Sequence, residues 1–116
     1  MTGFPKDVQD IILARSSGMC EVMLPCCTYQ AVEIQHRRAR GAGGTKRPET
    51  SYASNGLAVC RPCHSFIESH PLVALEKGWR VPQALSPAQE SVVWRQQRLW
   101  LDDFGGFERQ EERDVG

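Results

Sequence analysis

The stretch Cys60-Arg61-Pro62-Cys63-His64 decides which fold this chain can adopt. Its two thiols are separated by two residues, a spacing that lets both sulfurs of a tight turn face one point. An imidazole follows at once, at the expected start of a helix. The stretch therefore predicts half of a tetrahedral metal site, held next to a histidine that can donate a ring nitrogen to a separate divalent cation.

A second group of cysteines supplies the other half of that site. It consists of Cys20 with either Cys26 or Cys27, at a looser spacing than the usual zinc knuckle. The chain has five cysteines, an odd number, and we expect it in a reducing cytoplasm, where disulfides are disfavoured. A structural Zn²⁺ therefore explains the cysteines better than disulfides, a redox pair or unlinked buried thiols. A closed site of four thiolates has no open coordination position, so one of the two adjacent cysteines is expected to be spare.

The composition is that of one compact globular domain. Of the 116 residues, 41% are apolar and 24% are charged, so the core is modest and a metal crosslink would strengthen it. No apolar run approaches the roughly 20 residues that span a bilayer, and residues 1–10 lack the basic and apolar regions of a secretion signal. We therefore expect a cytoplasmic protein without a membrane partner.

The formal net charge is zero, but the charges are unevenly placed. Five cations follow one another without an intervening acid: Arg37, Arg38, Arg40, Lys46 and Arg47. A basic loop of this kind attracts the DNA backbone, because counterion release gives an affinity that does not depend on sequence. We predict that these side chains clamp phosphates; a solvated charged loop without a partner is the alternative.

Periodicity and turn residues predict short helices and strands. The expected helices are 4–15, 63–69 and 71–77, and the expected strands are 32–35 and 57–60. Residues 41–44 are rich in glycine and predict a loop, and residues 81–87 predict a linker. Strand-forming residues at 92–101, followed by a turn at 103–106, predict a β-hairpin-like tail appended to the core. Together these elements give an α+β fold.

Four polar residues around the cysteine pairs form a candidate catalytic group. His36 follows a predicted strand at the mouth of the basic loop, where an imidazole can take a proton from an attacking water. The amide of Asn55 can brace the facing loop through hydrogen bonds. His64 and Glu68 are four residues apart on one helix, so they form a pair of ligands for a divalent cation. Each residue alone is more often a surface or turn residue, and their order around the cysteines makes the group specific.

The order of these motifs resembles the HNH endonucleases, particularly the small zinc-containing ones of bacteriophages. The segments that carry the resemblance are Cys20 to Cys27, Ile34-Gln35-His36-Arg37-Arg38, Gly43-Gly44, Ser54-Asn55-Gly56-Leu57, Cys60-Arg61-Pro62-Cys63-His64 and Pro71 through Pro82. They cover about two thirds of the chain, residues 19–82. The tail at residues 98–106 is also similar to tails in phage members.

The resemblance implies a ββα-metal fold, in which two strands and a helix hold one catalytic divalent ion, commonly Mg²⁺ or Mn²⁺. By motif position, His36 is the general base, Asn55 braces the loop that carries the base, and His64 is a metal ligand. In phage members the position of the second cysteine favours Cys27 over Cys26 as the ligand of the structural zinc.

The chain departs from the family at two ligand positions. Gln35 precedes the expected base where Asp or His is usual, and a neutral amide is a poorer ligand for a hard cation than a carboxylate. Glu68 stands where a second helical histidine is frequent, and its charge can restore what Gln35 lacks. We therefore expect Gln35, His64 and Glu68 to hold the catalytic ion, with a weaker or altered metal dependence.

We predict a metal-dependent endonuclease that hydrolyses phosphodiester bonds of double-stranded DNA with low sequence specificity. Residues 1–82 would form the nuclease domain, and residues 83–116 an extension with an acidic end. We expect a monomer or weak homodimer in the host-cell cytoplasm, with phage terminase as a candidate partner. One alternative is a zinc-stabilised DNA-binding or terminase-associated module whose nuclease site has decayed. Another is an interaction protein that docks on its partner through Trp94 and Trp100.

Overall fold

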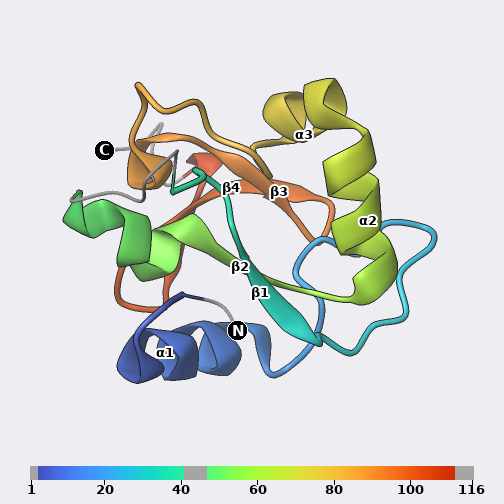
Figure 1. Ribbon diagram of the computed structural model, residues 1–116, viewed down its shortest axis with the longest axis horizontal. Helices are drawn as coiled ribbons and strands as arrows, with labels where there is room; N and C mark the ends of the chain where they lie inside the picture. Colours follow the sequence, from blue (N-terminus) through green and yellow to red (C-terminus); the bar gives the residue numbers. More distant parts are fainter. Residues whose placement is uncertain (1–2, 41–46, 112–116) are drawn as a thin grey trace.

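The computed structural model describes residues 3–40 and 47–111, and this part of the chain has an α+β fold (Figure 1). Its elements are α1 (Lys6–Ser16), β1 (Glu33–His36), β2 (Gly56–Val59), α2 (Arg61–Ser69), α3 (Pro71–Lys77), β3 (Val92–Trp94), β4 (Gln97–Leu101) and β5 (Phe107–Arg109). Short 3₁₀ helices occur at Pro48–Ser51, Ala53–Asn55 and Pro87–Gln89. β1 and β2 form one antiparallel sheet, and β3, β4 and β5 form a second. The predicted helices and strands are present, with ends shifted by at most two residues.

The β1–β2 pair lies between α1 and α2, which Figure 1 shows on its opposite sides. Its register pairs Gln35 with Leu57 and His36 with Gly56. Gly56 allows α1 to approach closely, because a Cβ atom there would lie 2.5 Å from Cδ1 of Ile12. Since successive side chains of a strand point to opposite faces, Gln35 and His36 are directed toward different helices.

Prolines and a glycine delimit the two helices that follow. Pro62 lies in the first turn of α2, where its missing N–H leaves no helical hydrogen bond unmade. Pro71 starts α3 directly after His70, the C-cap of α2. Gly78 ends α3 with a left-handed φ of 77°, and a Cβ atom there would lie 2.0 Å from the carbonyl oxygen of Ser91. This turn brings the chain after α3 against the C-terminal sheet.

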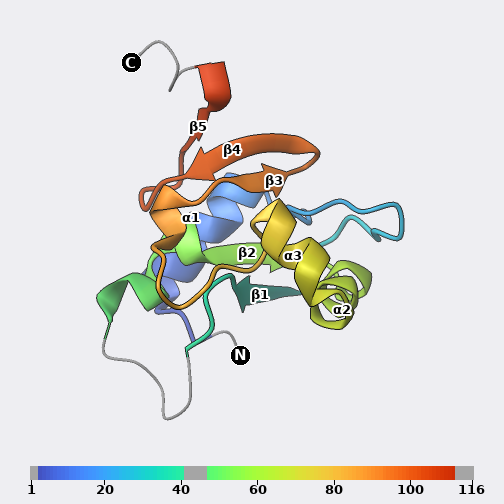
Figure 2. The same cartoon turned by 90° about the horizontal axis from the view of Figure 1, so that it is seen from above.

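The C-terminal sheet belongs to the core, so the prediction of an appended tail was wrong. Val92, Leu99 and Leu101 are buried in the same apolar cluster as Leu57 and Cys60. Figure 2 shows this sheet, coloured orange to red, along one side of the β1–β2 pair. The described residues on either side of position 82 therefore share one hydrophobic core. A short run of strand-forming residues does not reveal which surface it will cover, because that depends on distant packing.

A buried ion pair joins α1, β2 and β3. Arg15 donates to the carboxylate of Glu21 from Nε at 2.6 Å and from Nη2 at 2.7 Å. The same carboxylate accepts hydrogen bonds from the backbone N–H of Ala58 at 2.9 Å and from the indole N–H of Trp94 at 2.7 Å. Both charged side chains are buried, so loss of either partner would leave an uncompensated charge.

Candidate metal centre and adjoining cavity

Four cysteines converge at the start of α2 and could hold a metal ion. The Sγ atoms of Cys20, Cys27, Cys60 and Cys63 all lie within 4.8 Å of one another. The two Sγ atoms of Cys27 and Cys60 are 3.6 Å apart, close to the sulfur separation of about 3.8 Å in a tetrahedral zinc site with bonds of about 2.3 Å. The fifth cysteine, Cys26, is exposed. The cluster therefore contains Cys27, the cysteine that the family resemblance favours.

Local backbone contacts bring the first two thiols into this cluster. The N–H of Cys20 donates to the carbonyl of Tyr29 at 2.6 Å, and the N–H of Tyr29 donates to Sγ of Cys27 at 3.2 Å. Burial raises the pKa of Cys27 to about 11 and raises that of Cys63 as well. At Cys60, burial is outweighed by hydrogen bonds from the backbone of Thr28 and Cys63, which lower the pKa to about 6. Several thiolates are therefore favourable together only beside a cation, as expected for a metal-binding group.

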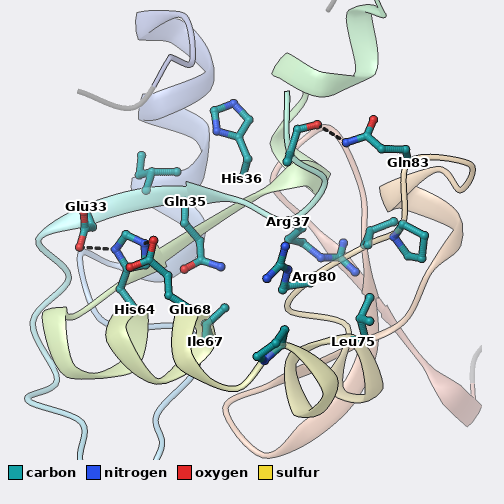
Figure 3. A pocket seen from close by; sticks show the side chains of 15 residues that line it. Glu33, Gln35, His36, Arg37, His64, Ile67, Glu68, Leu75, Arg80 and Gln83 are labelled. Atoms are coloured by element: carbon teal, nitrogen blue, oxygen red, sulfur yellow. Dashed lines mark hydrogen bonds and ion pairs between the residues drawn. The ribbon is translucent and has the colours of Figure 1, made fainter. Parts of the chain in front are cut away.

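A cavity of about 570 Å³ lies beside the metal centre and shares α2 with it. Its walls come from β1, α2, α3 and residues 80–83 (Figure 3). Gln35, His36, His64 and Glu68, all predicted as site residues, are among the residues that line it. Residues that precede Cys60 and residues that follow Cys63 in the sequence therefore line the same cavity.

His64 is oriented by a residue that the sequence analysis missed. Its Nδ1 lies 2.5 Å from Oε1 of Glu33, and its Nε2 lies 3.5 Å from Oε2 of Glu68. A carboxylate at Nδ1 fixes the proton there, which leaves Nε2 as the nitrogen with a free lone pair. Arg61 lies 3.5 Å from the same Glu33 oxygen. Glu33 is a strand residue two positions before Gln35, and only its distance from His64 in space marks it as part of the site.

Gln35 points toward α2 and toward the His64–Glu68 pair (Figure 3). Its Oε1 is buried and has no hydrogen-bond partner among the described residues, while its Nε2 is 3.5 Å from the carbonyl oxygen of Trp79. A buried carbonyl oxygen without a partner is costly, and a cation beside it would supply the missing interaction. The site thus offers one amide oxygen, one imidazole nitrogen and one carboxylate at the same end of the cavity.

His36 is turned the other way. Figure 3 shows its ring pointing away from His64 and Glu68, toward α1. The ring stacks on Phe4 with a centroid distance of 4.2 Å and an interplanar angle of 14°. Burial, and secondarily the charge of Arg40, lower its pKa, and its Nε2 is buried without a hydrogen-bond partner in the described part of the chain. The structure therefore places the predicted base at the cavity without directing its ring at the predicted ligands.

Asn55 is buried and holds the segment that follows His36. Its Nδ2 donates to the carbonyls of Arg38 at 3.1 Å and Thr50 at 2.9 Å. Its Oδ1 accepts the N–H of Arg38 at 2.6 Å. Three hydrogen bonds from one side chain fix the backbone at the end of β1 relative to the 3₁₀ helices.

Arg37 and Arg38, which were predicted to contact DNA, are buried, and this does not suit that role. Their relative exposures are only 2% and 1%, and their guanidinium groups face inward. Arg37 donates at 2.8 to 3.0 Å to four backbone carbonyls: those of Gly78, Ser54, Pro87 and Glu90. Arg38 donates to the carbonyl of Leu85 at 2.9 Å. These bonds also fix the predicted linker at 81–87, which is therefore packed against the core.

Two of the other three predicted cations lie on the surface. Arg40 and Arg47 are exposed, as contacts to phosphate require. Lys46 and the glycine-rich stretch at 41–44 lie outside the described residues. One exposed guanidinium that was not predicted, that of Arg80, also lines the cavity.

Comparisons with other proteins add no further assignment. No protein-family model, curated protein or solved structure matches the chain. Among residues 3–40 and 47–111, none of the helices combines the length and the hydrophobicity that a membrane span requires. The cysteine cluster and the cavity are therefore the features that bear on function.

Proposed function

We propose that this protein is a metal-dependent DNA endonuclease of the HNH type, built on a ββα-metal core. The observation that supports this most strongly is the pairing of His64 with Glu33. It turns Nε2 of His64 toward Glu68, at the cavity end that also holds the unpartnered oxygen of Gln35. The three side chains come from the first strand and the helix of a strand–strand–helix unit, as the resemblance to HNH endonucleases requires.

The donor atoms suit two different kinds of ion. Four thiols suit Zn²⁺, which would be structural because no coordination position stays open. The oxygens of Gln35 and Glu68, with one imidazole nitrogen of His64, suit a divalent ion such as Mg²⁺ or Mn²⁺. When bound, such an ion polarises the phosphoryl oxygen and stabilises charge on the leaving oxygen.

His36 is the proposed general base. Its lowered pKa keeps the imidazole neutral near pH 7, so it can accept a proton from a water molecule that attacks phosphorus. The ring has to leave Phe4 and turn toward the cavity to do so. Because Asn55 fixes the backbone just after His36, a side-chain rotation is the movement required.

Double-stranded DNA would be held through its backbone. Exposed Arg40 and Arg47, together with Lys46, are the proposed phosphate contacts in place of the buried arginines. Such contacts position DNA without reading bases, so sequence preference should be low and activity should fall as salt rises. Phage terminase is the proposed assembly partner.

Cleavage of supercoiled plasmid tests the proposal. Purified protein with Mg²⁺, Mn²⁺ or Ni²⁺ should nick the plasmid, and EDTA should abolish the reaction. His36→Ala and His64→Ala should each reduce the rate at least about 100-fold, the usual contribution of a general base or metal ligand. His70→Ala is the matched control, because His70 is an exposed histidine that stacks on Phe66. Equal losses in all three variants would contradict the assigned roles.

The alternative function is a zinc-stabilised DNA-binding or terminase-associated module without turnover. The observation that favours it is the His36 ring, which stacks on Phe4 and points away from His64. A folded, zinc-containing protein that binds DNA but cuts it with none of the three ions would support this module and contradict the nuclease.

A further inference from the structure

We propose that Arg80 binds a phosphate of the DNA strand that enters the cavity. The inference rests on the proposed nuclease function and names a substrate contact that the sequence motifs did not indicate. Arg80 lies in the segment after α3, and its exposed side chain lines the cavity.

The backbone at Arg80 is held rigidly on both sides. Its own N–H donates to the carbonyl of Ala74 at 3.1 Å, and the N–H of Val81 donates to the carbonyl of Arg37 at 2.9 Å. The flanking Trp79 and Val81 are 2% and 6% exposed. Only the side chain of Arg80 is therefore free to move, which lowers the entropy lost when it binds a ligand.

The guanidinium of Arg80 has no ion pair or hydrogen bond within the described ranges 3–40 and 47–111. This distinguishes it from Arg61, which lies 3.5 Å from Glu33, and from Arg98, which donates to Ser91 at 2.9 Å. An unpaired guanidinium that lines a hollow is available for a planar, two-point contact with phosphate.

Charge is separated along the cavity. Figure 3 shows Glu33, His64 and Glu68 at one end, and Arg37 and Arg80 toward the other. Arg37 adds to the positive end although it is buried, because its hydrogen bonds go to neutral carbonyls that do not cancel its charge. A cation at the acidic end and an anion at the basic end would together neutralise the cavity. A phosphodiester chain that reaches from the metal to Arg80 satisfies both conditions.

DNA binding as a function of salt tests this contact. Duplex binding is measured by fluorescence anisotropy in Mg²⁺, with every variant made in a His36→Ala background so that DNA is not cut. Arg80→Gln should weaken binding about tenfold and reduce the slope of log K against log salt by about 0.9, the value for one phosphate. Arg80→Lys should keep the slope, because it keeps the charge.

Arg98→Gln is the matched control, since it removes the same charge from an exposed position on β4. It should leave the slope of the parent unchanged. If Arg80→Gln and Arg98→Gln give the same slope while the wild-type protein cuts plasmid, the phosphate contact is overturned and the nuclease stands. If the wild-type protein neither binds nor cuts DNA, the proposed function fails and this inference fails with it.

Discussion

The cysteine cluster and the cavity share α2, yet they are built in opposite ways. Cys20, Cys60 and Cys63 are fully buried, and the four sulfurs of the cluster lie within 4.8 Å of one another. In the cavity Gln35, His36 and His64 are half-buried and Glu68 is exposed. The buried Oε1 of Gln35 has no hydrogen-bond partner among the described residues. Buried side chains that converge on a metal ion stabilise a fold. Buried polar atoms without hydrogen-bond partners instead favour the binding of an ion or ligand beside them. We therefore expect the first region to contribute stability, and we propose the second region as the site of the chemistry.

The largest expected effect comes from breaking the cysteine cluster. Cys60→Ala or Cys63→Ala should remove the metal and unfold the core, because structural zinc contributes on the order of 10 kcal/mol to folding. Circular dichroism and zinc content of the purified protein measure the two losses together. Cys26→Ala should change neither, since that thiol is exposed and outside the cluster. A Cys63→Ala variant that melts like the parent would contradict a stabilising role for the cluster.

Replacement of Arg37 separates its structural role from DNA binding. Arg37→Met should lower the free energy of unfolding by about 3 to 5 kcal/mol, because four carbonyls lose a charged donor. Urea denaturation measures the change. Arg98→Met on the exposed face of β4 should stay within about 0.5 kcal/mol of the parent. Weaker DNA binding with unchanged stability would instead restore Arg37 as a phosphate contact.

The smallest of the three effects is expected from replacement of Glu33, and it should be confined to metal binding in the cavity. Glu33→Gln should weaken Mn²⁺ binding about 10- to 100-fold, because His64 loses the carboxylate that fixes its proton. Titration of free Mn²⁺ by electron paramagnetic resonance measures the affinity, and the zinc content should stay constant. Glu76→Gln removes the same charge from an exposed position on α3 and should have no effect. Equal Mn²⁺ affinities for the two variants would show that Glu33 does not orient a metal ligand.

Local signals in the sequence were sufficient for most elements. Pro62, Pro71 and Gly78 mark the ends of α2 and α3. The ends of these helices could therefore be predicted closely from the local sequence. The spacing of the two cysteine groups likewise predicted a cluster. The residues alone did not decide whether Cys26 or Cys27 belongs to it. The β3–β4 turn was not foreseen, because Arg95 and Gln96 adopt positive φ there without the usual Asn or Gly.

Long-range contacts account for what the sequence did not predict. Consecutive arginines after a strand are typical of an exposed loop. The carbonyls that accept hydrogen bonds from the buried Arg37 lie 17 to 53 positions away in the chain. The Glu33–His64 contact joins residues 31 positions apart. Arg80 lies in a segment that carries the family resemblance, but no residue pattern there assigned it a role, and only its place in the cavity does.

The carbonyls that accept hydrogen bonds from Arg37 also bear on when the chain can complete its folding during synthesis. A ribosome adds residues from the N-terminus, so β1 emerges long before the carbonyls of Pro87 and Glu90 exist. Until then the guanidinium at the end of β1 lacks two of the bonds that compensate its burial. The strand that carries Gln35 and His36 therefore gains the full set of hydrogen bonds that Arg37 makes only after residue 90 has been made. The proposed site is thus fully supported only late in the synthesis of the chain.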